Sequence, residues 1–339
     1  MTTLTSPHDL LTAIPFLIGY HPTDSLVLVS LSDESVGMAM RVDYPKDIHS
    51  TSAHDLIDSL VMHLVREGGD GALVIAYSPM DHHDGELFLS FVSSALNDAN
   101  IQLREALLVQ GGRWRSTLCH DIECCPPLGR ELPEISASRI AAEQVRAGRP
   151  MPYLDSKALV DSISCLELSV DPKFLELVSV PVTSQKEGAI CVIDLASRFI
   201  SGAIGSDIAS DQELSAKVIS ALRDIQVRDF ALGSHSESTL QIYSMMWRYL
   251  MRIAPLGYVA PIACLMAALS YENGDGALAN RCLDRAFTDE PSYSLAGLLR
   301  RVFSAGWPPE SFSSMRLDLH PKVCASIFDS AHPKTVSPN

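Results

Sequence analysis

The sequence has no apolar stretch long enough to cross a membrane. A membrane-spanning helix needs about 20 consecutive apolar residues, and no apolar run in the 339 residues approaches that length. A basic leader segment is also missing, because the N-terminal apolar run contains Asp9 and Pro15 and is not preceded by Lys or Arg. We therefore expect a cytoplasmic protein with no membrane partner.

Positive charge is scarce. Lys and Arg total 26 against 41 Asp and Glu, so the formal net charge is −15 with neutral His. A chain this acidic is repelled by the phosphate backbone, which argues against bulk nucleic-acid binding.

Several catalytic signatures are absent. The sequence contains no Walker-type phosphate loop, no dinucleotide-binding glycine motif, no H-E-x-x-H helix and no G-x-S-x-G elbow. ATP hydrolysis by a Walker loop and simple nicotinamide chemistry are therefore unsupported. The absence of these motifs does not decide whether the protein is an enzyme, but it favours a protein that is not one.

The residues that are present have the composition of a globular protein. Hydrophobic residues make up 47% of the chain and charged residues 20%, which supplies enough apolar material for one large core or two ordinary ones. Eight Cys occur without an export signal. This combination predicts a reducing compartment, in which the cysteines are thiols.

Residues 1–130 are predicted to form an α/β domain. Strands that alternate with helices are typical of a sheet covered by crossover helices. Strands are expected at residues 25–31, 36–44, 72–77 and 106–109, and helices within residues 1–20 and at residues 52–66 and 85–99. The pair Gly111-Gly112 predicts a tight hairpin turn. The first domain is therefore expected to be a mixed sheet with β-hairpins and covering helices.

The remainder of the chain is predicted to be helical. We expect a helical, Pro-rich connector over 131–185, an all-α domain over 186–330 and a disordered tail over 331–339. Within the all-α domain, helices are expected at residues 211–229, 237–252, 259–271, 276–287 and 293–303.

One helix pair in this domain has the residue spacing of a tetratricopeptide repeat. Small and apolar residues at matching positions let two helices pack closely, and they are Ala267, Ala279, Leu283, Ala286 and Pro291. An ordinary helical hairpin explains the same residues, because no neighbouring copy is in register. Either interpretation favours protein interaction over chemistry.

The most unusual segment is a cysteine cluster. Cys119, Cys124 and Cys125 fall within seven residues, and His120 follows the first of them. Thiolate and imidazole are zinc ligands, so these four residues are a candidate metal site and zinc is the candidate cofactor. The spacing C-x₄-C-C departs from the usual paired knuckles, and neighbouring cysteines are expected to point in different directions. A loop with structural thiols is the competing interpretation.

Two further polar groups are candidates for binding. Arg113 and Arg115 share one face of a predicted strand, and Trp114 lies on the other. Such a group could hold an anionic ligand, although an edge strand with charged outer positions has the same pattern. His21 and Asp24 precede the first strand and form a possible acid–base or ligand pair, or a plain turn.

Five segments together resemble a known family. They are Asp9–Val29, Arg41–Pro45, Arg113–Gly129, Val227–Asp229 and Gly274–Leu299. The family is actinobacterial and is defined as a domain of unknown function. The resemblance implies an origin in such a bacterium or its phage, and it implies no activity, cofactor or catalytic residue.

Two functions from different classes follow. The first is a non-enzymatic binding or scaffold protein, which presents the Arg113–Cys125 loop and binds a protein partner through its acidic helical domain. The alternative is a metal-assisted hydrolase or nuclease. In that alternative the cysteines hold the ion, and the two arginines hold an anionic substrate. Substrate, partner identity and oligomeric state stay undetermined by the sequence.

Overall fold

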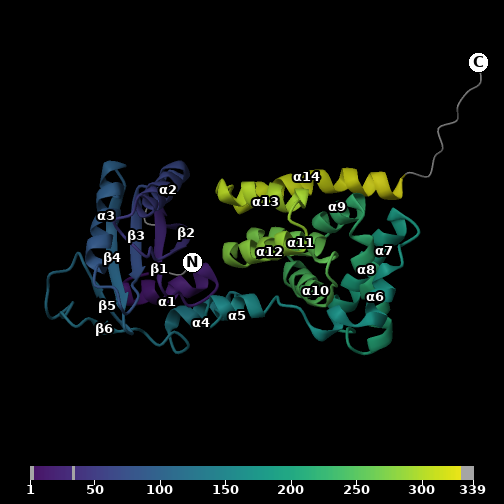
Figure 1. Cartoon of the computed structure of the whole chain (residues 1–339), viewed down its shortest axis with the longest axis horizontal. Coiled ribbons are helices and arrows are strands. Elements are labelled where there is room, and N and C mark those ends of the chain that lie inside the picture. Colours follow the sequence, from purple (N-terminus) through teal and green to yellow (C-terminus); the bar gives the residue numbers. More distant parts are fainter. Residues whose placement is uncertain (1–3, 33–34, 330–339) are drawn as a thin grey trace, which may run out of the picture. The chain divides into compact units, whose positions relative to one another are not determined.

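The computed structural model describes residues 4–32 and 35–329. The predicted tail at 331–339 lies outside these residues. The chain divides between Leu159 and Val160 into two compact units. The first is a mixed α/β unit and the second is all-helical (Figure 1), which confirms the predicted fold class.

The segment expected to be a connector over 131–185 is shared between the two units. Its first helix, α4 (Arg139–Arg146), packs against the N-terminal helix of the first unit. A later helix, α6 (Pro172–Ser179), packs against the second unit's α8 (Ile208–Ala221). Buried apolar side chains, Ile140 in α4 and Phe174 in α6, attach each helix to its unit.

The first unit is built on a six-stranded sheet. Its elements are α1 (Pro7–Ile18), β1 (Ser25–Ser32), β2 (Ser35–Asp43), α2 (Thr51–Glu67), β3 (Gly71–Tyr77), α3 (Gly85–Asp98), β4 (Gln102–Gln110), β5 (Arg113–Ser116), β6 (Arg130–Glu131) and α4, and α5 (Ser156–Asp161) crosses the division. The strand order is β2-β1-β3-β4-β5-β6. Only the β3–β4 pair is parallel among these neighbours.

Alternation along the strands explains the core of this unit. Leu26 and Leu28 of β1 are fully buried in one cluster with apolar residues of α2 and α3. Val27 and Val29 point to the opposite face and are buried as well. A strand that is apolar on both faces belongs inside a sheet, and β1 lies between β2 and β3 as expected.

The predicted Gly-Gly hairpin is confirmed. Gln110 of β4 pairs with Arg113 of β5, and φ is 59° at Gly111 and 74° at Gly112. Two consecutive positive φ values are what a two-residue type I′ turn requires. The turn reverses the chain, so that β5 leads directly into the cysteine loop.

The second unit contains only helices among its described residues. Its elements are η1 (Glu167–Val170), α6, α7 (Gln185–Ile200), α8, α9 (Ile225–Gly233), α10 (Leu240–Ile253), α11 (Val259–Glu272), α12 (Gly276–Asp289), α13 (Ser294–Ser304) and α14 (Pro309–Phe328). The predicted close helix pair is α11 and α12. These two helices pack against each other, and Ala267, Ala279 and Ala286 are fully buried.

The prediction of a single helix over 211–229 is wrong, because α8 ends and a separate helix, α9, begins within this range. Asp224 accepts hydrogen bonds from the backbone N–H groups of Gln226 (2.8 Å) and Val227 (3.4 Å). This side chain therefore caps a new helix, as Asp does at helix N-termini. The continuous apolar periodicity concealed the cap. Among the described residues, no helix is both long enough and apolar enough to cross a membrane.

A buried ionic network connects α14 to the rest of the helical unit. Arg316 donates from Nε to Glu272 Oε1 at 2.7 Å and from Nη2 to Oε2 at 3.1 Å. Its Nη1 donates to the carbonyl oxygens of Gly233 and His235, both at 3.2 Å. His235 Nε2 lies 3.1 Å from Glu272 Oε2. The side chains of Arg316, Glu272 and His235 are all at least 95% buried.

This network predicts acid sensitivity of the helical unit. Burial raises the pKa of Glu272, but hydrogen bonds and charge from His235 and Arg316 outweigh it, and the net pKa is lowered. A depressed carboxyl pKa stabilises the fold above the unfolded-state value of about 4.3, and this stability is lost as pH falls through the folded-state pKa. Urea unfolding between about pH 5 and pH 3 should show a steeper stability loss for the wild type than for Glu272→Gln. Equal slopes would contradict the role given to Glu272.

Candidate metal centre

The cysteine loop begins with a turn held by Ser116 at the end of β5. The Ser116 hydroxyl oxygen accepts from the backbone N–H groups of Leu118 and Cys119, both at 3.2 Å. The same hydroxyl donates to Glu105 Oε1 at 2.6 Å, which anchors it to β4. The side chain of Ser116 therefore reverses the chain just after the strand and places Cys119 at the turn.

A second turn, held by Asp121, positions the other two cysteines. Asp121 Oδ1 accepts from the N–H groups of Glu123 (2.9 Å) and Cys124 (3.4 Å). Its backbone carbonyl accepts from the N–H of Cys125 at 2.6 Å. In such a helix-like turn, successive side chains differ in direction by about 100°, instead of the 180° of a strand.

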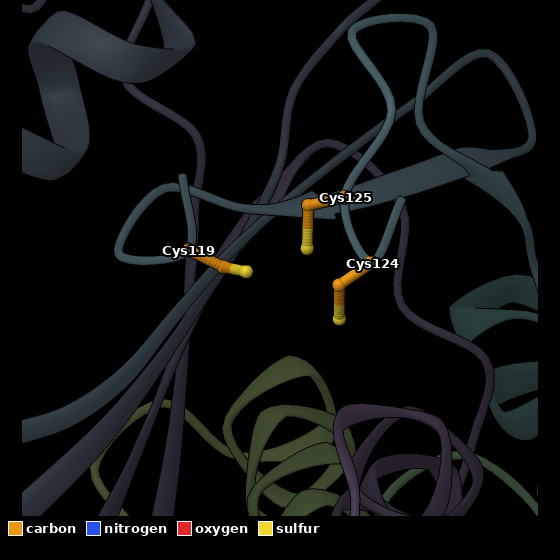
Figure 2. A group of neighbouring side chains, drawn as sticks. All are labelled: Cys119, Cys124 and Cys125. Carbon is orange, nitrogen blue, oxygen red and sulfur yellow. The ribbon is translucent and has the colours of Figure 1, made fainter. Parts of the chain in front are cut away.

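The three sulfur atoms converge. The Sγ atoms of Cys119, Cys124 and Cys125 all lie within 4.8 Å of one another. Figure 2 shows Cys124 and Cys125 pointing the same way, with Cys119 directed toward them. The expectation that neighbouring cysteines would point apart is therefore wrong, because the turn keeps their side chains on one side of the loop (Figure 2), whereas a strand would send them to opposite faces. Zn–S bonds of about 2.3 Å place tetrahedral thiolates about 3.8 Å apart, so closure needs sulfur movements of at most about 1 Å.

The surroundings of the cluster differ from one thiol to the next. Cys124 is exposed, whereas Cys119 and Cys125 are half-buried. Burial raises the pKa of the Cys125 thiol, and its contacts with the thiols of Cys119 and Cys124 raise it further, against a hydrogen bond from the Ser116 backbone. A metal ion that binds here displaces the thiol protons.

Two arginines hold the loop in shape. Arg113 Nε donates to Leu128 O at 2.8 Å, and its Nη2 donates to Gly129 O at 2.8 Å. Arg130 donates from Nε to Cys124 O at 2.6 Å and from Nη2 to Glu123 O at 2.9 Å. The guanidinium group of Arg113 therefore stabilises the loop, and these hydrogen bonds compete with the predicted binding of an anionic ligand. The role of Arg130 in holding the loop was not predicted from the sequence. The only signal was its position directly after the loop, next to Gly129.

The other two members of the predicted anionic-ligand group are also engaged or buried. Arg115 forms an ion pair with Glu86 of α3. Trp114 lies on the opposite face of β5 and is buried, and its indole nitrogen has no hydrogen-bond partner there. The predicted division of these three residues between two faces of the strand is confirmed.

The remaining predicted site residues do not join the sulfur atoms. His120 is exposed and is not part of the converging group. Asp24 has a φ of 42°, and its carbonyl accepts from Tyr44 N at 2.8 Å, so it forms a turn at the start of β1. His21 is half-buried, and its backbone N–H donates to Tyr153 O at 3.0 Å. Burial lowers the pKa of His21, against the opposing effect of Glu134.

A second polar cluster lies where β2 and β3 end. Tyr44 Oη donates to Asp84 Oδ1 at 3.1 Å, and His82 Nδ1 lies 3.4 Å from the same oxygen. Asp84 precedes α3 but makes no capping hydrogen bond to it. This cluster was not predicted from the sequence. The sequence signal for this cluster is a polar residue after β2 and another after β3, because these two strands end at the same edge of the sheet.

Gly129 gives a test of how the loop closes against β5. Its φ is 70°, and an added Cβ would lie 2.8 Å from Trp114 O. Gly112 has a φ of 74°, with no atom within 4 Å of an added Cβ. Left-handed strain costs about 1–3 kcal/mol at either position, so the collision should make Gly129→Ala clearly more destabilising than Gly112→Ala. Urea unfolding of both variants measures this difference, and equal losses would contradict the close approach.

Fold and site together define a class: a two-unit protein with a mixed α/β sheet, a helical unit and a three-thiol loop beside the sheet edge. The family model described as Domain of unknown function (DUF4192) matches residues 7–310. The chain therefore belongs to this family, which confirms the resemblance found in the sequence. No curated protein matches the chain, and no solved structure matches it either.

Proposed function

We propose that the protein is a cytoplasmic, non-enzymatic binding or scaffold protein whose cysteine loop holds a zinc ion. The observation that carries this proposal is the convergence of the sulfur atoms of Cys119, Cys124 and Cys125 within 4.8 Å. Soft thiolate donors select zinc or monovalent copper over magnesium, calcium or manganese. Thiols that persist in a reducing compartment are available to such an ion.

The ion would cross-link a loop that contains little regular structure. Between β5 and β6 the chain is held by the side chains of Ser116, Asp121, Arg113 and Arg130. A metal that joins Cys119 to Cys124 and Cys125 connects the two turns directly. The loop then becomes a rigid surface on the α/β unit.

The engagement of the arginines supports a binding role over hydrolysis. A metal-assisted hydrolase or nuclease needs cationic side chains that reach its anionic substrate. Arg113 is instead bonded to the backbone of its own loop, and Arg115 is paired with Glu86. The net charge of −15 is a further argument against a nucleic-acid substrate.

The helical unit is proposed to bind a protein partner. Its closely packed α11–α12 pair resembles an interaction repeat in residue spacing. A chain shortened to the first unit, and shown to be folded by circular dichroism, should no longer capture a stoichiometric partner from a host lysate. A shortened chain that captures the same partner would assign binding to the α/β unit instead.

The proposal is tested by metal content together with thiol mapping. Untagged protein, purified with thiol protection, should contain about one zinc per chain, as a single site requires. Alkylation followed by peptide mapping should modify Cys119, Cys124 and Cys125 only after a chelator removes the metal. Cys165 is exposed and should react throughout, whereas Cys282 is fully buried and should stay protected in the folded chain. A protein free of zinc, with the loop cysteines reactive from the start, would contradict the proposal.

A further inference from the structure

We infer that the metal centre has an exchangeable fourth coordination position that takes a neutral imidazole in preference to a carboxylate. The inference rests on the proposed zinc site. It adds the position and the chemical class of the ligand that completes the site.

The number of donors among the described residues leaves one coordination position open. Zinc in proteins takes four donors, and sites with three protein donors leave one position for another molecule. No further His, Cys, Asp or Glu among the described residues joins the three converging sulfur atoms. Cys124 is exposed, so the cluster lies at the surface, where an external side chain can reach the ion.

Charge selects the ligand class. Three thiolates and one divalent ion carry a net charge of −1 at the centre. The same loop exposes the carboxylates of Asp121 and Glu123, and the whole chain carries −15. The guanidinium group of Arg130 is directed at the carbonyl oxygens of Glu123 and Cys124. A fourth anionic donor would therefore increase an uncompensated negative charge, whereas a neutral imidazole would not.

The chain's own adjacent imidazole is not in place to fill this position. His120 follows Cys119 directly, yet it is exposed and lies outside the converging group. The Ser116 and Asp121 turns fix the backbone on both sides of His120 through bonds to the N–H groups of Cys119 and Glu123. Among the described residues, the fourth position is therefore left open to an imidazole added from solution.

Cobalt(II) substitution tests the inference on the full-length protein. Cobalt bound to thiolates absorbs in the near ultraviolet, and its visible bands respond to exchange of a ligand. Titration with imidazole should shift the visible bands saturably, with one imidazole per cobalt, while acetate at equal concentration leaves them unchanged. The His120→Ala variant should behave like the wild type.

Two results would overturn the inference. Visible bands that do not respond to imidazole in the wild type would show a closed site. A response that appears only in His120→Ala would show that His120 completes the coordination itself. A chain that shows no thiolate–cobalt absorption at all has no such metal site. That result would remove the proposed function together with the inference, whereas the first two remove the inference alone.

Discussion

Replacement of Glu272 by Ala should lower the free energy of unfolding of the helical unit by about 3–5 kcal/mol, the usual cost of removing one partner of a buried ion pair. The side chains of Glu272 and Arg316 are 4% and 5% exposed. Without the carboxylate, the guanidinium group of Arg316 is left buried beside His235 with no compensating negative charge. Because Arg316 lies in α14 and Glu272 ends α11, the loss should also loosen the attachment of α14.

Urea unfolding, followed by the fluorescence of Trp247 and Trp307 in a Trp114→Phe background, measures this effect in the helical unit. Glu237→Ala is the matched control, because this glutamate is exposed in the segment just before α10, and surface substitutions usually change stability by less than about 0.5 kcal/mol. A Glu272→Ala variant as stable as the control would show that the network contributes little.

Replacement of Cys125 by Ser should weaken zinc binding by more than about 100-fold, which is the upper end of the effect seen when only an outer partner of a metal ligand is changed. Serine keeps the size of the side chain but replaces a soft thiolate with a hydroxyl group, which zinc binds poorly at neutral pH. Competition with a chromophoric chelator measures the change in affinity. The far-ultraviolet circular dichroism should stay that of the wild type, because the sheet and helices do not depend on this side chain.

Cys165→Ser is the matched control for that substitution. Cys165 is exposed in the second unit, where Arg285 Nη2 donates to its sulfur at 2.9 Å, and it is not part of the cluster. Zinc affinity in this variant should equal that of the wild type. If Cys125→Ser also kept the wild-type affinity, the cluster would not be the metal site.

Local patterns were sufficient to predict much of the fold. The Gly111-Gly112 hairpin follows from two positive φ values that glycine adopts without strain, and the inner position of β1 follows from its two apolar faces. The break between α8 and α9 was not predicted. Asp224 caps the second helix within an apolar periodicity that runs on without interruption, so the break depends on a hydrogen bond that spacing does not reveal.

The sequence indicated the three cysteines as a candidate group together with His120, but it did not reveal how the sulfur atoms converge. Cys119, Cys124 and Cys125 are close in sequence, which made them a candidate group. The common direction of the last two depends on the Asp121 turn, and the stiffness of the loop depends on Arg113 and Arg130. These bonds join residues 3 to 16 positions apart in an irregular segment, where no periodicity indicates the contacts.

X-ray absorption at the zinc edge tests the central claim most directly. The account predicts three sulfur donors at about 2.3 Å and one lighter donor at about 2.0–2.1 Å in the zinc-loaded, full-length protein. A shell made only of nitrogen and oxygen would contradict a zinc ion held by Cys119, Cys124 and Cys125, and one made of four sulfur atoms would contradict the open fourth position.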